Sequence, residues 1–271
     1  MSVTLGFVGN GFVGSAGRQL ECTKNKVLVY DIDPDKCVPN GTTLDDVAAC
    51  DLVFVSVPTP AEPGGRCHLG IVESVVAKLK AANADARIVI RSTVPPGTSE
   101  RLGTLFMPEF LTESNYMGDF RNNPLWVVGG ETKTIQQLLT NAKEAGKIAS
   151  DTICYMSTGE AELVKYVRNC FLATKVSFFN ELEAFCRGSG LDFDKVRHAA
   201  ASDARVGLGH TQVPGPDGRR GFGGHCFPKD VAAWCHFAPS EHSVVRTVHE
   251  RNRQLDRPGK DWEADKGRAI L

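Results

Sequence analysis

The chain has 271 residues and a formal net charge of −1 at pH 7, and 42% of its residues are hydrophobic. This length is enough for one large domain or for two smaller ones. The balanced charge and a pI near 6.7 give no electrostatic sign of a nucleic-acid or anionic-membrane partner. No apolar run is long enough to span a bilayer, so we expect no membrane segment.

The nine cysteines are scattered along the chain and form no CxxC pair. An odd and unpatterned set favours reduced thiols in a cytoplasmic protein over a disulfide framework or a zinc site. The histidines show no HExxH spacing either. We therefore expect no metal.

The N-terminal residues have the pattern of a dinucleotide-binding turn. A short apolar run, Val3–Val8, is typical of a buried parallel strand and leads into Gly9–Gly14, which fits GxGxxG and opens a helical pattern. A second apolar run, VLVYD, ends at Asp31, twenty residues after Gly11. The glycines permit a tight turn, and the helix N-terminus binds pyrophosphate. An acid at Asp31 favours NAD over NADP because it repels a 2′-phosphate; Asp33 is the competing candidate.

Strand and helix patterns then alternate through the first 157 residues. Apolar runs at 51–57, 87–93, 105–107, 126–130 and 152–156 predict strands, and 71–81 and 132–145 predict helices. This alternation indicates an α/β fold with a Rossmann-type doubly wound parallel sheet. Ligands of such sheets bind beyond the carboxyl ends of the strands. The loops at 58–60, 92–97 and 108–113 should therefore line one crevice with the glycine turn.

The pattern becomes mostly helical from residue 158. We predict an NAD-binding domain at 1–157 and a helical dimerisation and catalytic domain at 158–271. The absence of proline and glycine between Gly159 and Gly188 predicts one helix of about 28 residues. Its apolar residues cover more than one face, which predicts a homodimer through 160–185. Further helical patterns at 194–201 and 231–255 flank an irregular stretch at 203–220.

The decapeptide GFGGHCFPKD, residues 221–230, places Cys226 beside glycines, Lys229 and Asp230. A cation near a thiol lowers the thiol pKa and favours a thiolate nucleophile. Taken alone, the decapeptide fits a structural turn with a buried thiol equally well. Lys165 and Asn169 lie four residues apart, and hence on one face of the long helix, where solvated polar residues are the default interpretation.

Read together and in order, these motifs resemble the UDP-glucose/GDP-mannose dehydrogenase family, most closely its UDP-glucose branch. The matching segments are VPTP at Val57, STVPPGT at Ser92, PEFLTE at Pro108, EAELVKYVRNCFLATKVSFFNE at Glu160, ARVG at Ala204 and GFGGHCFPKD at Gly221. The resemblance implies two successive hydride transfers to NAD. They convert the C6 alcohol of a nucleotide sugar, UDP-glucose above all, to a carboxylate without a metal.

The resemblance also implies roles for individual residues. Cys226 is the nucleophile that captures the aldehyde, and Lys165 and Asn169 stabilise the oxyanion. Asp230, Thr93 and Glu113 position or activate water. The implied cofactor-binding residues are Gly9, Gly11, Phe12, Val13, Gly14, Asp31, Lys36, Pro58, Thr59, Ser92 and Thr93. The implied substrate-binding residues are Glu109, Phe110, Leu111, Lys165, Asn169, Arg205, Phe222 and Gly223.

The sequence departs from the family at one point. Family members usually carry a third domain of about 100 to 150 residues that grips the UDP half of the substrate, whereas this sequence ends at Leu271. We therefore expect this sequence to contain the catalytic residues but to lack most of the contacts that usually bind the UDP half of the substrate. Arg205, Arg219 and Arg220 are candidates for holding a diphosphate, and a solvated basic loop is the competing interpretation.

Two other functions are compatible with parts of the pattern. One is a single-step NAD-dependent hydroxyacid dehydrogenase acting on a smaller substrate, which would have no use for Cys226. The other is a non-enzymatic remnant that binds NAD alone. The joint presence of Cys226, Lys165, Asn169 and Asp230 disfavours both.

Overall fold

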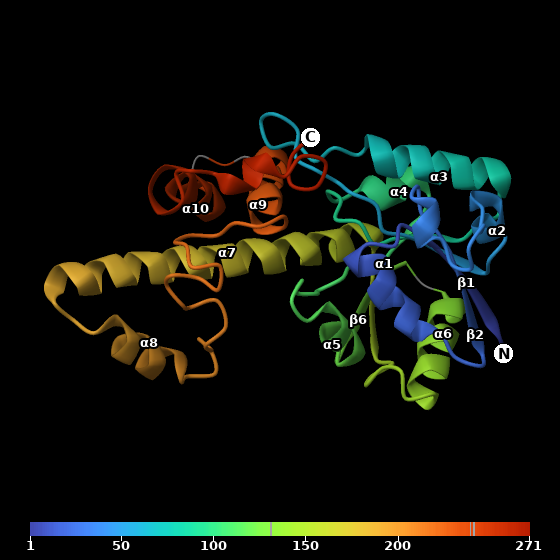
Figure 1. Cartoon of the computed structure of the whole chain (residues 1–271), viewed down its shortest axis with the longest axis horizontal. Coiled ribbons are helices and arrows are strands. Elements are labelled where there is room, and N and C mark those ends of the chain that lie inside the picture. Colours follow the sequence, from blue (N-terminus) through green and yellow to red (C-terminus); the bar gives the residue numbers. More distant parts are fainter. Residues whose placement is uncertain (131, 239, 241) are drawn as a thin grey trace. The chain divides into compact units, whose positions relative to one another are not determined.

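The computed structural model describes residues 1–130, 132–238, 240 and 242–271. These residues form two compact units (Figure 1). The sheet unit consists of Met1–Thr59 and Leu69–Lys165, and the helical unit consists of Pro60–His68 and Tyr166–Leu271. The domain boundary expected after residue 157 stays a prediction. The compact units differ from it because Pro60–His68 packs with the C-terminal part of the chain.

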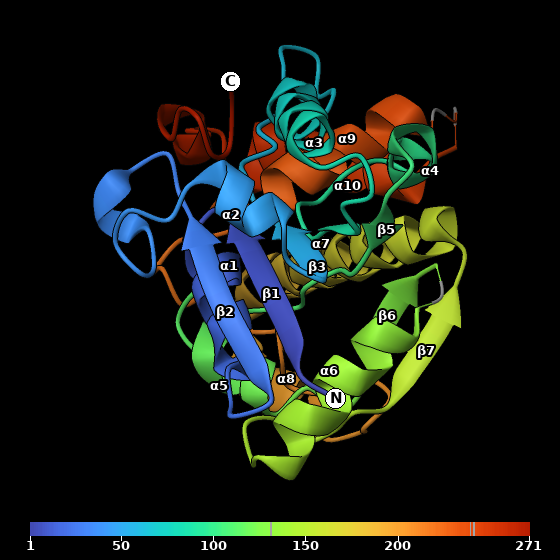
Figure 2. The same cartoon turned by 90° about the vertical axis from the view of Figure 1, so that its right-hand side faces the viewer.

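The sheet unit is built on a seven-stranded sheet of order β2-β1-β3-β4-β5-β6-β7 (Figure 2). The strands are β1 (Val3–Val8), β2 (Asn25–Tyr30), β3 (Leu52–Val55), β4 (Ile88–Ile90), β5 (Leu105–Phe106), β6 (Trp126–Gly129) and β7 (Ile153–Met156). All neighbours are parallel except β5 and β6, which pair antiparallel where Phe106 lies opposite Gly129. The predicted doubly wound, mostly parallel sheet is confirmed.

Apolar side chains cover both faces of this sheet, as the continuous apolar runs predict for parallel strands. Phe7 and Phe54 stack with ring centroids 5.1 Å apart on one face. Val53 and Val55 join Val72 of helix α3 in the core of the other face. The helices of the unit are α1 (Phe12–Gly17), α2 (Leu44–Ala48), α3 (Gly70–Ala82), α4 (Thr98–Leu102), α5 (Tyr116–Arg121) and α6 (Lys133–Glu144).

A single helix of 32 residues, α7 (Thr158–Ser189), begins in the sheet unit and continues into the helical unit (Figure 1). The predicted long helix is thus confirmed. It ends before Gly190, whose φ of +67° suits a residue without a side chain. Helix α8 (Phe193–Ala201) follows it.

The single helix expected at 231–255 is wrong, because the chain forms two helices there. They are α9 (Phe227–Phe237) and α10 (Val244–Arg251), which continues into a π-helical turn, η3 (Asn252–Asp256). A proline at position 239 lacks the N–H donor that a continuous helix needs. The Ser243 hydroxyl caps the N-terminus of α10 by accepting a hydrogen bond from Arg246 N at 3.2 Å. Positions 239 and 241 lie outside the described residues.

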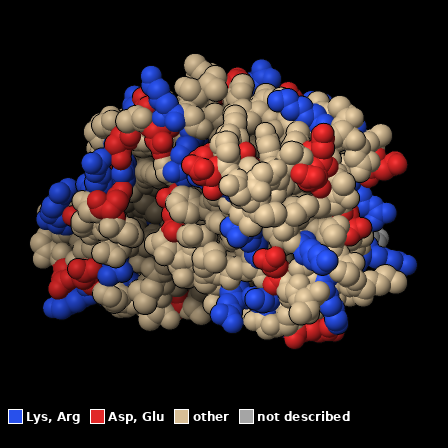
Figure 3. Space-filling model, turned by 45° about the vertical axis from the view of Figure 1, so that its right-hand side comes forward, with Lys and Arg blue, Asp and Glu red and all other residues tan. Residues whose placement is uncertain are grey.

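Charged side chains of both signs are interspersed on the face drawn in Figure 3, in keeping with the net charge of −1. Within the described part of the chain, no helix combines the length and the apolar character needed to cross a membrane.

Candidate active site residues in two units

The glycine turn after β1 has a backbone that side chains would block. Gly9 has a φ of +94°, and a Cβ there would lie 2.4 Å from the Ser56 carbonyl oxygen. A Cβ on Gly14 would lie 1.9 Å from the Gly9 carbonyl oxygen. Gly11, the N-cap of α1, has open space at its Cβ position instead. The turn is therefore closed on its inner side and open where the helix N-terminus meets solvent, as a pyrophosphate requires.

The acid at the end of β2 is joined to this turn. Asp31 accepts hydrogen bonds from Asn10 N at 2.7 Å and from Asp33 N at 3.0 Å. The Asn10 amide donates to the Lys36 carbonyl oxygen at 2.7 Å. The Asp33 carboxylate is occupied by Asp35 N and by the Lys36 ammonium, the latter at 3.0 Å. Asp31, rather than Asp33, is thus attached to the glycine turn.

The other predicted cofactor residues lie on α1 and on two loops at the strand ends. Phe12 and Val13 form the first turn of α1, and the Phe12 ring packs edge-on against Tyr116 with centroids 5.2 Å apart. The Ser92 hydroxyl accepts from Val57 N at 2.9 Å and donates to the Val57 carbonyl oxygen at 2.7 Å. Ser92 thus ties the loop after β4 to the loop after β3. Thr59 and Thr93 are buried and Pro58 is exposed on these loops.

A buried ion pair joins α7 to the loop after β5. The Lys165 ammonium donates to the Glu109 carboxylate at 2.7 Å and to the Glu109 carbonyl oxygen at 2.8 Å. It also lies 5.9 Å from the centroid of the Phe110 ring. The second carboxylate oxygen of Glu109 accepts from Leu111 N at 2.7 Å. Burial alone would raise the pKa of Glu109, but Lys165 and this backbone bond lower it below its ordinary value. The structure thus brings Glu109, Phe110, Leu111 and Lys165 together, while Glu113 is exposed in the same loop.

Two buried charges in the sheet unit were missed by the sequence analysis. The Glu162 carboxylate accepts from Gly97 N at 2.6 Å and from Ser99 N at 2.7 Å, which fixes the start of α4. Burial raises the pKa of Glu162 despite these bonds. Arg91, directly after β4, is fully buried with its guanidinium 5.5 Å from the Phe120 ring centroid. Burial lowers the pKa of Arg91 to about 10, against the opposing effect of Glu109.

Cys226 lies at the N-cap of α9 in the helical unit. Among the nine cysteines, all of which the structure describes, Cys226 alone is exposed. The backbone dipoles at a helix N-terminus favour a negative charge, and a thiolate is such a charge. The structural-turn interpretation with a buried thiol therefore does not fit this cysteine.

A carboxylate one turn into α9 holds two polar groups. Asp230 is buried and accepts from the Asn169 amide at 2.5 Å and from the Lys229 ammonium at 2.5 Å. Burial alone would lower the pKa of Lys229, but the charges of Asp230, Cys226 and Cys67 raise it above its ordinary value. Lys229 is therefore held as a cation that interacts electrostatically with Cys226. This arrangement also removes Asn169 from the default interpretation as a solvated helix residue.

The remaining predicted substrate residues fall into two groups. Phe222 is buried and Gly223 is half-buried in the glycine segment before Cys226. The three arginines of the irregular stretch each have an acidic partner. Arg205 pairs with Asp203 in an exposed bidentate contact at 2.5–3.1 Å, Arg219 with Asp261 at 3.0 Å, and Arg220 with Glu183. The proposed diphosphate contact stays a prediction, and these pairs would have to open for it.

The predicted site residues thus form two sets, one in each compact unit. The sheet unit holds the glycine turn with Asp31, the Ser92 and Thr93 loop, and the pair of Glu109 and Lys165. The helical unit holds Asn169, Asp230, Lys229 and Cys226. Asn169 follows Lys165 by one helical turn along α7.

Two family models match successive parts of the chain. Residues 40–144 match the model of the UDP-glucose/GDP-mannose dehydrogenase family NAD binding domain, and residues 159–254 match that of its central domain. A UDP-glucose 6-dehydrogenase of Rickettsia typhi is 30% identical over 305 residues, covering 96% of this chain and 68% of that protein. One of Pseudomonas aeruginosa is 31% identical over 247 residues, covering 83% of this chain and 53% of that protein.

The solved structures include a UDP-glucose dehydrogenase from the hyperthermophilic archaeon Pyrobaculum islandicum, with a TM-score of 0.78 and 27% identity. The match covers 92% of this chain and 68% of that one. The chain therefore spans only about half to two thirds of the length of these relatives. Over that span, its sequence and its fold agree with both domain models, and the chain belongs to the UDP-glucose/GDP-mannose dehydrogenase family.

Proposed function

We propose that the chain oxidises the C6 alcohol of a nucleotide sugar, UDP-glucose first among them, to the carboxylate in two NAD-dependent steps. The observation that carries this proposal is the exposed Cys226 at the start of the helix on which the buried Asp230 binds Asn169 and Lys229. A dehydrogenase that stops at the aldehyde or ketone has no need of a thiol. An enzyme that proceeds to a carboxylate needs a nucleophile and a base for water.

The sheet unit fits NAD. The glycine turn leaves open space at Gly11, and the N–H groups of the first turn of α1 follow it. Asp31 stands at the turn as a hydrogen-bond acceptor for a ribose hydroxyl and disfavours a 2′-phosphate. When bound, NAD accepts one hydride in each of the two oxidations.

In the first oxidation, the alcohol loses a hydride from C6 and a proton from its oxygen, which leaves an aldehyde. The Cys226 thiolate then adds to the aldehyde carbon, and the carbonyl oxygen becomes an alkoxide that takes up a proton. Lys165 and Asn169 donate hydrogen bonds to this oxygen as it gains negative charge. Glu109 orients the Lys165 ammonium, because its carboxylate lies 2.7 Å away.

In the second oxidation, the tetrahedral carbon bonded to sulfur loses its hydride, and its oxygen loses the proton, which leaves a thioester. Water attacks the thioester carbon and the carbon–sulfur bond breaks, which gives the carboxylic acid and restores the Cys226 thiolate; the acid then loses its proton to solvent and becomes the carboxylate. Asp230 takes the proton of this water, and Thr93 and Glu113 orient it. Lys229 stabilises the thiolate as the leaving group, because the charge of Cys226 is one of those that raise the pKa of Lys229 above its ordinary value.

The test is the yield of NADH per molecule of UDP-glucose, with the product identified by mass spectrometry. We expect two NADH and UDP-glucuronate from the unchanged chain. Cys226→Ser should abolish carboxylate formation, because a hydroxyl is a much poorer nucleophile at neutral pH, while NAD affinity is unchanged. Cys235→Ser, on the same helix, is the matched control.

The outcomes separate the candidate functions. One NADH per substrate, with activity on a small hydroxyacid, would indicate the single-step dehydrogenase. NAD binding without oxidation of UDP-glucose, GDP-mannose or hydroxyacids would indicate the non-enzymatic alternative. Carboxylate formation by Cys226→Ser at a near-normal rate would exclude the covalent mechanism.

We also propose that the chain forms a homodimer through α7. Exposed apolar side chains recur along one stripe of this helix, at Leu163, Val167, Phe171, Phe178 and Phe185. The three phenylalanines are 65%, 61% and 63% exposed. A row of large apolar side chains exposed to water is typical of an interaction surface, and the proposed occupant is the same helix of a second copy of the chain.

Sedimentation at micromolar concentration tests this proposal. The unchanged chain should sediment as a dimer or a larger assembly, and Phe171→Glu with Phe178→Glu should shift it toward a monomer because buried carboxylates oppose association. Lys195→Glu, an exposed change on α8, should leave the assembly unchanged. A monomeric unchanged chain would refute the interface.

A further inference from the structure

The segment that carries the reactive thiol, Gly221–Cys226, is called the catalytic loop below. It contains three glycines, so its backbone has an unusually large conformational freedom to lose when it is fixed in place. Helix α9 fixes only its last residue. Three contacts to the others come from far along the chain, from residues 252–271, called the C-terminal segment below.

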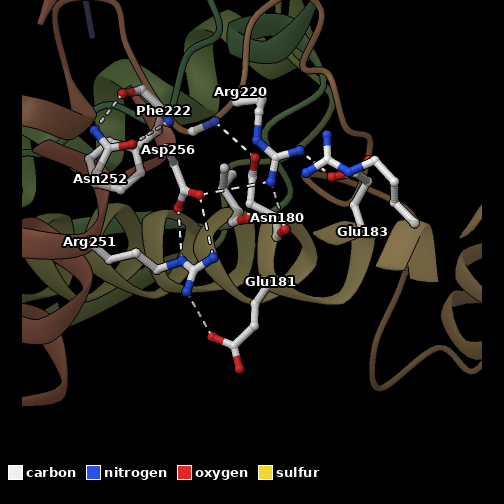
Figure 4. A network of polar contacts seen from close by, with 11 residues as sticks. Asn180, Glu181, Glu183, Arg220, Phe222, Arg251, Asn252 and Asp256 are labelled. Carbon is white, nitrogen blue, oxygen red and sulfur yellow. Dashed lines mark hydrogen bonds and ion pairs between the residues drawn. The ribbon is translucent and has the colours of Figure 1, made fainter. Parts of the chain in front are cut away.

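The first contact is made by Asn252, at the start of η3 (Figure 4). Its side-chain oxygen accepts from Phe222 N at 2.9 Å, and its amide nitrogen donates to the Phe222 carbonyl oxygen at 2.9 Å. This pair of bonds satisfies both backbone groups of Phe222, as a neighbouring strand would. Asn180 on α7 accepts from Gly221 N at 3.0 Å, so two buried amides hold consecutive residues of the loop.

The backbone shape at Gly221 depends on this contact. Its φ is +66°, and a Cβ there would lie 2.3 Å from the Asn252 side-chain oxygen. Asn252 itself is packed beside a buried charge network. Asp256, four residues later, receives the Arg251 guanidinium at 2.9 Å and lies 3.9 Å from that of Arg220 (Figure 4).

The second and third contacts follow the loop toward the thiol. The Arg257 guanidinium lies against Gly223, where a Cβ would meet its central carbon at 2.4 Å. Asp261 holds Arg257 in this position by two bonds of 2.5 and 2.7 Å. The Asp265 carboxylate then pairs with the Nδ1 atom of His225, the residue directly before Cys226.

The three contacts follow the same order along both segments. Asn252, Arg257 and Asp265 contact Phe222, Gly223 and His225 in turn, so the C-terminal segment runs alongside the catalytic loop. We infer that Asn252 and Asp265 are positioning residues for Cys226, acting through the backbone of Phe222 and the ring of His225. This inference rests on the proposed function for its catalytic consequence, but its structural part does not need substrate.

The reaction demands such positioning. A thiolate displaced by about 1 Å from the aldehyde carbon costs on the order of 10²-fold in rate. Three of the six residues of the loop are glycines and have no side chain to pack, whereas Phe222 packs into the core of the helical unit. The C-terminal segment supplies the restraint from outside the loop.

The experiment compares Asn252→Ala, Asn252→Asp and Asp265→Asn in the full chain. Glu263→Gln is the matched control, because Glu263 belongs to the same segment but pairs with Arg253 at 3.0 Å. The readouts are amide hydrogen exchange of residues 221–226, the alkylation rate of Cys226 by iodoacetamide, NAD affinity, and kcat for NADH formation.

We expect Phe222 N–H to exchange at least about tenfold faster in Asn252→Ala. Exchange in Asn252→Asp should be intermediate, since the carboxylate keeps the acceptor for that N–H. Asp265→Asn should change the alkylation rate of Cys226. Both Asn252→Ala and Asp265→Asn should lower kcat about 10- to 100-fold with unchanged NAD affinity, and Glu263→Gln should change none of these quantities.

Exchange, alkylation and kcat values equal to those of the unchanged chain in Asn252→Ala and Asp265→Asn would overturn the inference. Equal effects from Glu263→Gln would also overturn it, because the segment would then act only through general stability. If Asn252→Ala does not fold, the alkylation rate and kcat of Asp265→Asn test the inference, because Asp265 is half-exposed and its substitution leaves the core intact. Exchange and alkylation require no turnover, so failure of the proposed reaction with UDP-glucose is recognised separately.

Discussion

The glycine turn of the sheet unit and the catalytic loop of the helical unit are both rich in glycine, but they are shaped by different means. In the turn, the nearest obstacle to a side chain is backbone close by in the sequence or on the neighbouring strand, at the carbonyl oxygens of Gly9 and Ser56. In the catalytic loop, the obstacles are the side chains of Asn252 and Arg257.

Because the two segments are shaped differently, we expect them to tolerate different mutations. A turn shaped by its own backbone needs its glycines and little else, which is why a short motif describes it well. A loop shaped by remote side chains needs both the glycines and their partners, and no local pattern reveals the partners. The following predictions test this contrast, beginning with the largest expected effect.

Lys165→Ala and Asn169→Ala should each lower kcat by about 10²–10³, because each removes one donor to the developing oxyanion. NAD affinity should change little, since the glycine turn and Asp31 are untouched. Lys175→Ala is the matched control: this lysine lies on the same helix and bonds the carbonyl oxygens of Val206 and Gly207. The measurement is kcat with UDP-glucose as substrate under steady-state conditions. An unchanged kcat in both variants would mean that Lys165 and Asn169 do not stabilise the oxyanion and have only a structural role.

Asp31→Ala should weaken NAD binding by roughly 1.5–3 kcal/mol, the usual contribution of a hydrogen bond to a charged group. Binding of NADP should weaken less or improve, because the repulsion of the 2′-phosphate is removed. Titration of both cofactors measures this, with Asp35→Ala as the nearby control. Equal affinities of the unchanged chain for NAD and NADP would refute the assignment of Asp31.

Gly14→Ala should destabilise the fold by about 1–3 kcal/mol, because its methyl group would overlap the Gly9 carbonyl oxygen. Gly11→Ala should barely change the stability, since its Cβ would enter open space, but it should weaken NAD binding by obstructing the pyrophosphate. Chemical denaturation and NAD titration of both variants test the pair. Equal losses of stability in Gly14→Ala and Gly11→Ala would contradict the finding that a Cβ has no room at Gly14 and open space at Gly11.

The sequence predicted the sheet, the glycine turn and the long helix because each depends on local patterns, whereas the roles of the site residues rest on the family resemblance and stay predictions. Val3–Val8 and VLVYD show the strands, and the GxGxxG spacing shows the turn. It missed the burial of Arg91, the contact of Glu162 with the start of α4, and the pairing of Asn252 with Phe222. These depend on contacts between residues far apart in the chain. The break between α9 and α10 is not in the expected helix at 231–255, although a proline at position 239 disfavours a continuous helix there.

The path of the chain has a consequence for synthesis and for protein engineering. Pro60–His68 emerges early, yet it packs with residues from the other end: Ala61 N donates to the Ala269 carbonyl oxygen at 3.0 Å, and Leu271 N donates to the Ala61 carbonyl oxygen at 2.9 Å. The helical unit therefore cannot be completed until residues 269–271 have been made, while the sheet unit is available once Lys165 has been made. A cut after residue 157 would separate this early segment from Ala269 and Leu271.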